Sequence, residues 1–236
     1  LPVLVLTGGV VARNLALAEA KGLDVMTTCA TSHAIMCNTA LDMQRDPVYA
    51  STVNNLVART SKVEYGGESQ SWHLVHYLVE EIGLDKVRDA VKNPLKMNIA
   101  AYYGPDMQRE GACAGDDPFM PTYMEQLIEA LGGTPIDYES KCNSVGSTSM
   151  LTLEDSSLAM TAAVLSDAIQ SGADLIVSAC TISHINLDSY QSKAGRVAGK
   201  NTIVPVCHLS ELVAFALGFY PDRLAQLRTR VRLIGS

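Results

Sequence analysis

The chain carries the pattern Cys-x-x-Ser-His twice, each time after a short apolar segment that opens with Gly-x-Asp. The first copy, residues 22–33, contains Cys29, and the second copy, residues 172–184, contains Cys180. A thiol at the end of a buried strand can serve as a metal ligand or as one half of a disulfide. Cys29 and Cys180 are therefore the first candidates for chemistry in this chain.

A second pair of matching segments follows these two copies. A His-Leu pair opens an apolar segment that ends on a glycine ten positions later, from His73 to Gly83 and again from His208 to Gly218. Two matches in the same order indicate an internal duplication rather than a coincidence. The sequence therefore predicts two related halves, each of which once held the same chemistry.

The length of the chain is compatible with this division. Its 236 residues can form one full domain or two domains of about 100 residues. We place the boundary near Asn93-Pro94, so that residues 1–94 form the first half and residues 95–236 the second. Because the first residue is Leu1 rather than methionine, we expect the first half to be incomplete at its N-terminus.

Composition excludes several classes of protein. The net charge of −7, with no cluster of lysine and arginine, argues against a nucleic-acid groove. No apolar run reaches the roughly 18 residues of a membrane helix, and the longest candidate, residues 202–219, contains His208 and Glu211 and fits an amphipathic helix. Six cysteines scattered through an acidic, enzyme-like chain favour a reduced, cytoplasmic setting.

The order of the expected elements predicts the fold class. Short β-rich segments alternate with helical segments of 10 to 15 residues, which is typical of an α/β fold with mainly parallel sheets flanked by helices. The expected strands are residues 23–28, 96–103, 134–138, 174–179 and 203–206. The expected helices are residues 12–21, 34–43, 49–60, 72–82, 84–91, 121–131, 156–170 and 208–218, with residues 2–6 as a separate apolar segment before a break at residues 7–9.

In parallel sheets, functional sites gather in the crevice at the carboxyl ends of the strands. Cys29, Gly104, Cys142 and Cys180 all lie at such ends, and this shared location is the strongest argument for a site. The remaining cysteines are expected to be small buried residues without chemistry, namely Cys37, Cys113 and Cys207.

Other kinds of site find less support in the sequence. The two Ser-His pairs lack the Gly-x-Ser-x-Gly elbow of a serine hydrolase, so His33 and His184 are expected to cap helices or to fill buried polar positions. His73 and His208 are expected to begin helices. The chain has no Cys-x-x-Cys pair for zinc, and Gly8-Gly9 lacks the remaining glycines of a dinucleotide-binding loop.

Several ordered segments carry a resemblance to a known family. They are Arg13 to Glu19, Ala101 to Gly104, Phe119 to Gly132, Pro135 to Cys142, Asp174 to Gln191 (with His184 to Asp188) and Pro205 to Leu212. Together they resemble the cysteine-rich CCG-domain family, which includes the B subunit of heterodisulfide reductase and relatives in sulfur-oxidising complexes and in succinate or fumarate reductases. The resemblance covers essentially the whole chain.

The resemblance implies a cofactor and a ligand set. Each half of the family supplies five thiolates to a non-cubane [4Fe-4S] cluster that splits a disulfide, and the matching positions here are Cys29, Cys142 and Cys180, with Cys142 and Cys180 as metal ligands. Pro105, Asn143 and Ser183 stand where the family has further cysteines of the second half, Ser32 likewise in the first half, and the segment before Leu1 would hold others. The ligand set is therefore incomplete, because soft thiolates are what iron–sulfur clusters require.

The resemblance leaves three functional hypotheses. In the first, the chain is a subunit of a heterodisulfide-reductase-like electron-transfer complex with altered cluster chemistry. Cys142 and Cys180 would then act on a small disulfide or sulfur substrate, and flavin- and iron–sulfur-bearing subunits would exchange electrons with it. In the second, the chain is a non-catalytic scaffold that docks those redox partners, and in the third it is an unrelated α/β enzyme.

Overall fold

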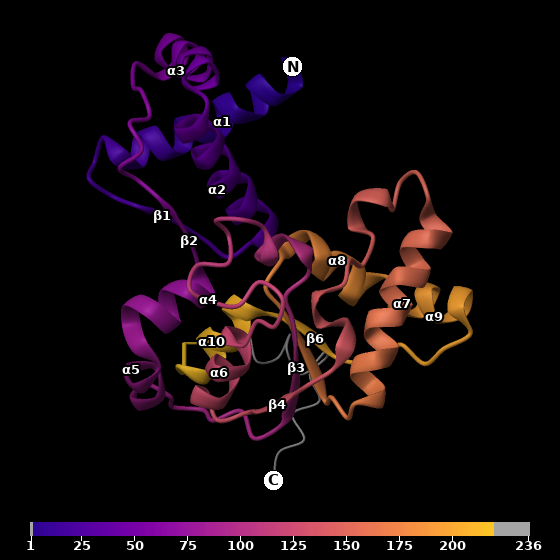
Figure 1. Cartoon of the computed structure of the whole chain (residues 1–236). Coiled ribbons are helices and arrows are strands. Elements are labelled where there is room, and N and C mark those ends of the chain that lie inside the picture. The colour runs from indigo at the N-terminus through magenta and orange to yellow at the C-terminus, as the bar shows by residue number, and fades with distance from the viewer. Residues whose placement is uncertain (1, 220–236) are drawn as a thin grey trace.

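Six short strands form two parallel sheets in the computed structural model, which describes residues 2–219 (Figure 1). The first sheet pairs β1 (Val25–Thr27) with β2 (Ser71–His73). The second sheet has the order β4-β3-β5-β6, formed by β3 (Asn98–Tyr102), β4 (Thr134–Ile136), β5 (Leu175–Ser178) and β6 (Val206–His208). All pairings are parallel, which confirms the predicted α/β class.

Helices connect successive strands, as parallel pairing requires. The α-helices are α1 (Pro2–Glu19), α2 (Ala30–Arg45), α3 (Pro47–Ser61), α4 (Leu74–His76), α5 (Leu84–Asp89), α6 (Tyr123–Ala130), α7 (Glu154–Gln170), α8 (Thr181–Ser189), α9 (Gln191–Ala198) and α10 (Leu209–Ala216). A π-helix, η1 (Tyr77–Gly83), joins α4 to α5, and three short 3-10 helices are η2 (Pro105–Gln108), η3 (Glu139–Cys142) and η4 (Ser147–Ser149).

Strand β3 shows how the four-stranded sheet builds a core on each face. Ile99 and Ala101 belong to a buried cluster with side chains of α4, α5, α6 and α10. Ala100 and Tyr102, which point to the opposite face, pack in a second cluster with α7 and with Leu187 of α8. The sheet is therefore covered by helices on both faces, and Figure 1 shows α6 and α10 on one side of it and α7 on the other.

Helices α1, α2 and α3 form a separate packed unit at the N-terminal end of the molecule (Figure 1). The predicted break at residues 7–9 is wrong, because α1 continues through Gly8 and Gly9. A Cβ atom on Gly8 would lie 2.1 Å from the hydroxyl of Tyr49, and one on Gly9 would lie 2.6 Å from a methyl group of Leu56. The two glycines thus allow α1 and α3 to approach closely, and tertiary packing outweighs their low helix propensity.

The backbone repeats the pattern seen in the sequence. Thr27 of β1 is paired with His73 of β2, and Ser178 of β5 is paired with His208 of β6. In each case the first strand leads, through a cysteine, into α2 or α8, and the histidine ends the second strand and caps α4 or α10. The helix-start role predicted for both histidines is confirmed, since His73 accepts the N–H of Val75 and His208 that of Ser210.

Two expected elements differ from the structure. The helix expected over residues 72–82 begins only at Leu74, because Ser71–His73 pairs with β1 and an extended strand cannot also be helical. The last strand occupies Val206–His208 rather than residues 203–206. Helix α9 was not expected at all.

The boundary predicted at Asn93-Pro94 falls between α5 and β3. Val75 of α4 and Val87 of α5 nevertheless pack in the same core cluster as Ile99 of the four-stranded sheet. The division into residues 1–94 and 95–236 stays a prediction, and residues 220–236 of the second half lie outside the described part of the chain.

Candidate functional site

The two repeated cysteines meet at the carboxyl ends of β1 and β5. Cys29 precedes α2 and Cys180 precedes α8, both in extended backbone, with φ/ψ of −118/115 and −132/121 degrees. The N–H of Ala30 donates to the carbonyl of Ala179 at 3.0 Å, which ties the two loops together. The side chains of Cys29 and Cys180 are hydrogen-bonded to each other, and neither cysteine forms a disulfide.

The surroundings of Cys29 favour its thiolate. Its pKa is lowered, first because the Cys180 thiol donates a hydrogen bond to it, and further by hydrogen bonds from Ser32 and from the backbone of Thr181 at the start of α8. Burial opposes this shift, since a low-dielectric site disfavours a charge. Cys29 is only partly buried, whereas Cys180 is buried.

Cys180 is the protonated member of the pair. It is 2% exposed, and its pKa is raised by the hydrogen bond to Cys29 and by burial. Its sulfur also lies 3.2 Å from the hydroxyl of Thr31. That hydroxyl donates to Asp106 at 2.6 Å, and Asp106 pairs with Arg109 at 3.0 Å.

Four histidines near the thiol pair show a repeated arrangement. The ring centroids of His33 and His73 are 5.9 Å apart, and those of His184 and His208, their counterparts in the second copy, are 5.8 Å apart. Nε2 of His73 lies 2.9 Å from the carbonyl of Ala179, and a carbonyl can only accept, so this nitrogen carries the proton. Burial lowers the pKa of both His33 and His73, which keeps the two rings neutral.

Cys142 lies beside the same region, in η3. Its side chain is hydrogen-bonded to Gln108 of η2, and burial raises the pKa of its thiol to about 11. The preceding residue, Lys141, is paired with Glu125 at 2.8 Å, and Glu125 accepts the hydroxyl of Tyr103. The side chain of Cys180 is thus hydrogen-bonded to Cys29, and that of Cys142 to Gln108.

The three positions to which the resemblance assigns further cysteines of the second half hold Ser183, Asn143 and Pro105. Ser183, in the first turn of α8, hydrogen-bonds Cys180 through its backbone and Tyr102 through its side chain. The Tyr102 hydroxyl donates to the carbonyl of Asn143 at 2.9 Å. Pro105 begins η2, which carries Asp106. The sequence analysis did not single out Thr31 and Asp106, whose only signal was their place just after strand ends.

The donor set at this site does not fit a four-iron cluster of the family type. Within residues 2–219, no group of three or more histidine, cysteine or carboxylate side chains is arranged to hold a metal ion. The thiols that converge are two, and the positions that complete the family's set hold a proline, an asparagine and a serine, whose groups bind iron poorly.

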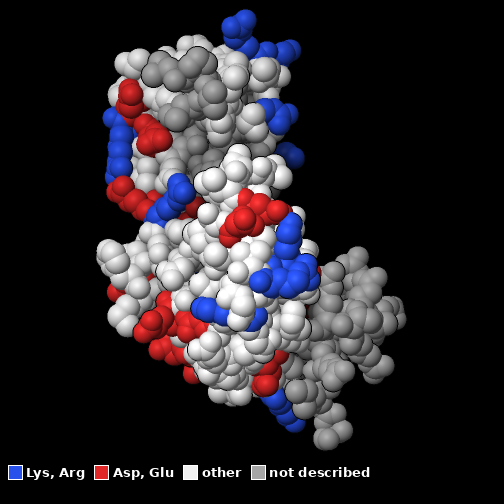
Figure 2. Space-filling view, turned by 90° about the vertical axis from the view of Figure 1, so that its right-hand side faces the viewer, with Lys and Arg blue, Asp and Glu red and all other residues white. Residues whose placement is uncertain are grey.

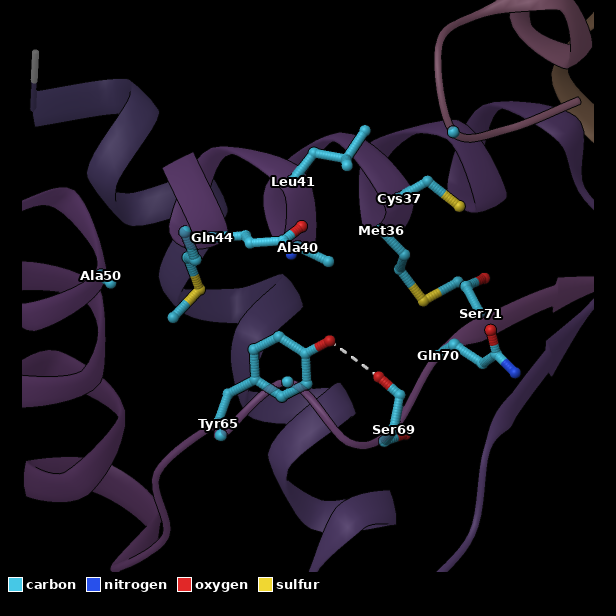
Figure 3. A pocket seen from close by; sticks show the side chains of 14 residues that line it. Met36, Cys37, Ala40, Leu41, Gln44, Ala50, Tyr65, Ser69, Gln70 and Ser71 are labelled. Carbon is cyan, nitrogen blue, oxygen red and sulfur yellow. Dashed lines mark hydrogen bonds between the residues drawn. The ribbon is translucent and has the colours of Figure 1, made fainter. Parts of the chain in front are cut away.

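The other three cysteines are Cys207, Cys37 and Cys113. Cys207 is a buried residue of β6, in the core cluster of the four-stranded sheet. Cys37 lies mid-helix in α2 and lines a pocket of about 500 Å³ whose lining residues are all uncharged. Figure 3 shows this pocket between α2 and the segment around Tyr65 and Ser69, where the Tyr65 hydroxyl donates to the Ser69 carbonyl. Burial raises the pKa of Cys37 to about 11, and the nearby Cys113 raises it further.

The surface adds two observations. The face drawn in Figure 2 carries acidic and basic side chains in small separate groups, so this face has no continuous basic surface for nucleic acid. Among the helices of residues 2–219, none combines the length and the apolar character needed to cross a membrane.

Comparison with known proteins gives several similar relatives, of which three are described. The chain is 29% identical over 215 residues to the B subunit of the ferredoxin:CoB-CoM heterodisulfide reductase of Methanosarcina mazei, a match that covers 90% of this chain and 71% of that protein. It is 32% identical over 209 residues to the 8-methylmenaquinol:fumarate reductase membrane anchor subunit of Wolinella succinogenes, covering 88% and 72%. It is 29% identical over 229 residues to a protein of Archaeoglobus profundus that is named as similar to the heterodisulfide reductase B subunit, covering 92% and 74%.

A solved structure shares the fold. It is that of a hypothetical protein from Helicobacter pylori, with a TM-score of 0.71 and 14% identity over 95% of this chain. The chain spans 41% of the length of that protein, and at this identity the likeness bears on the fold alone. No family model matches the chain.

Proposed function

The chain belongs to the family of the heterodisulfide reductase B subunit and its relatives, and we propose that it works as a subunit of a redox complex in which Cys29 and Cys180 form the reactive thiol pair. Support for the complex comes from the relatives, two of which are named as subunits of reductases and one as a subunit-like protein. The partners would be flavin- and iron–sulfur-bearing subunits, which would exchange electrons with the chain because it has no dinucleotide-binding loop of its own. The complex would lie in the cytoplasm.

The contact between the two thiols carries the chemical part of the proposal. A thiolate is the nucleophile in thiol–disulfide exchange, and Cys29 is both the thiolate and the less buried of the two residues. Cys29 attacks one sulfur of a small disulfide, forming a mixed disulfide and releasing the first thiol. Cys180 then attacks the Cys29 sulfur and releases the second thiol, which leaves a Cys29–Cys180 disulfide.

The cycle closes when two electrons from a partner subunit and two protons restore both thiols. The net reaction is the reduction of one disulfide to two thiols. This scheme needs two thiols, which is what the site offers, whereas the cluster chemistry of the family needs more thiolates than converge here. The proposal therefore includes an altered redox chemistry relative to the family. The cysteine pair expected from the sequence, Cys142 with Cys180, stays a prediction.

A chemical trapping experiment tests the reactive pair. The reduced full chain, purified under anaerobic conditions, is mixed with 5,5′-dithiobis(2-nitrobenzoate), quenched in acid and analysed by peptide mass spectrometry. We expect a Cys29–Cys180 disulfide in the native protein and in Cys142→Ser, and a trapped mixed disulfide on Cys29 in Cys180→Ser. If a Cys142–Cys180 disulfide forms instead, the partner of Cys180 in the reactive pair is Cys142 and not Cys29.

The scaffold remains the second candidate, because large apolar side chains are exposed, with Phe119 at 89% and Leu151 at 98% of their surface. Such side chains can mark a docking surface. Turnover of the purified complex separates the candidates. A scaffold would keep native turnover in Cys29→Ser and Cys180→Ser, whereas a reactive pair would lose it in both. Iron and acid-labile sulfide analysis of the same samples would show whether a cluster is bound.

A further inference from the structure

Three side chains form a hydrogen-bonded line from solvent to the buried thiol of the site. Asp106, whose side chain is 20% exposed, accepts the hydroxyl proton of Thr31 at 2.6 Å. The same hydroxyl oxygen lies 3.2 Å from the sulfur of Cys180. The line joins η2, α2 and the loop before α8, so the two halves of the chain contribute to it.

The number of protons in this line decides its chemistry. A hydroxyl carries one proton and two lone pairs, and an ionised carboxylate can only accept. While Thr31 donates to Asp106, it can offer Cys180 only a lone pair. Once Cys29 is bound in a mixed disulfide and no longer accepts the Cys180 proton, the Cys180 thiol is placed to pass that proton to Thr31 while Thr31 passes its own proton to Asp106.

A proton acceptor is needed at one step of the proposed cycle. Cys180 is buried and holds its proton at neutral pH, yet it must lose that proton to attack the mixed disulfide on Cys29. Cys29 cannot accept the proton at that moment, because its sulfur is already bonded to the substrate sulfur.

We propose that Asp106, acting through the Thr31 hydroxyl, takes up the proton of Cys180 as Cys180 attacks the sulfur of Cys29. The Cys180–Cys29 bond forms and the bond from Cys29 to the substrate sulfur breaks. The departing sulfur keeps the electron pair and leaves as a thiolate, which takes a proton from water. Asp106 returns the Cys180 proton to solvent through its exposed side. The disulfide is the oxidant, and this inference rests on the proposed function. Asp106 is a positioning residue here, and Thr31 joins it to the reacting thiol.

The test separates the two steps of the exchange in time. The reduced full chain is mixed with 5,5′-dithiobis(2-nitrobenzoate) and quenched in acid at intervals. Peptide mass spectrometry then follows the mixed disulfide on Cys29 and the Cys29–Cys180 disulfide. We expect Asp106→Asn to form the mixed disulfide at the native rate and to close the disulfide at least about tenfold more slowly, a conservative share of general-base catalysis. Thr31→Val should behave like Asp106→Asn, and Thr31→Ser should recover most of the native rate.

The pH profile distinguishes proton transfer from a structural effect. Without the carboxylate, Cys180 must lose its proton to hydroxide, so the closing rate in Asp106→Asn should rise about tenfold per pH unit between pH 6 and 8. The native rate should rise much less over the same interval. Glu110→Gln is the matched control, because Glu110 is an exposed acid nearby that pairs with Arg45, and it should leave both steps unchanged.

Two results would overturn the inference in different ways. If Asp106→Asn and Thr31→Val close the disulfide within about twofold of the native rate, with a native pH profile, the proton route is wrong and the thiol pair stands. If the native chain forms no Cys29–Cys180 disulfide, the proposed function fails and the proton route fails with it.

Discussion

The stability of the chain should depend strongly on pH because three buried histidines pack together. The ring centroids of His33, His73 and His76 lie 5.5 to 5.9 Å apart, and each residue is at most 2% exposed. Burial lowers their pKa values to about 4, about 3 and about 3, respectively. In the unfolded chain their pKa values return to about 6.5.

The direction of the effect follows from proton binding. Below pH 6.5 the unfolded chain binds protons at these histidines and the folded chain does not, so stability falls as the pH falls toward the folded pKa values. From pH 8 to pH 5 each histidine costs about 2 kcal/mol, and the three together cost about 6 kcal/mol as an upper limit. This is comparable to the whole stability of many domains, which is about 5 to 15 kcal/mol.

Urea unfolding at pH 8, 6.5 and 5 measures this loss, and His76→Phe isolates one histidine. Phenylalanine keeps a ring among the neighbouring rings, and Nδ1 of His76 has no hydrogen bond to lose. Between pH 8 and pH 5 the variant should lose about 2 kcal/mol less than the native chain. The Cys29 contribution is common to both proteins and cancels in the comparison.

Leu74→Ala serves as the control, since it removes apolar packing of the same helix, α4, without removing a titrating group. It should lower stability by a similar amount at each pH. If the native chain and His76→Phe lose stability in parallel from pH 8 to pH 5, the buried histidine does not stay neutral and the reasoning is refuted.

Two further predictions concern the thiols and the glycines. Iodoacetamide at pH 6 should label Cys29 much faster than Cys142, because the Cys29 pKa is lowered and the Cys142 pKa is raised to about 11. Peptide mass spectrometry measures the two labelling rates, and equal rates would contradict the assignment of Cys29 as the thiolate. Gly146→Ala should be more destabilising than Gly172→Ala by about 1 to 3 kcal/mol in urea unfolding. Both glycines have positive φ, but only at Gly146 would an added Cβ atom clash with the backbone, since it would lie 2.8 Å from Cα of Ser157. Equal losses of stability in the two variants would show that the backbone at Ser157 shifts to make room for the added Cβ atom.

Local patterns in the sequence predicted much of the fold. The Gly-x-Asp segment before Cys180 predicted a strand over residues 174–179, and β5 spans Leu175–Ser178. The His-Leu pairs predicted the starts of two helices, because a histidine ring nitrogen can accept a free N–H in the first turn. These features depend on neighbours within a few residues.

Features that depend on distant partners were not predicted. Gly8 and Gly9 looked like a break, and only the close approach of α3 makes them suitable for a helix. The segment Ser71–His73 looked helical, and only its pairing with β1 makes it a strand. The contact of Cys29 with Cys180 and the line from Thr31 to Asp106 join segments far apart in the chain, and no local spacing encodes them.

The meeting of Cys29 and Cys180 also bears on how the chain resists heat. A covalent bond between them would close a loop of roughly 150 residues, which removes enough freedom from the unfolded chain to stabilise the folded one by about 5 kcal/mol on a chain-entropy estimate. The oxidised protein would then melt at a higher temperature than the reduced protein. By thermodynamic linkage, folding would favour disulfide formation by the same amount, so the fold itself would help to set the reduction potential of the pair.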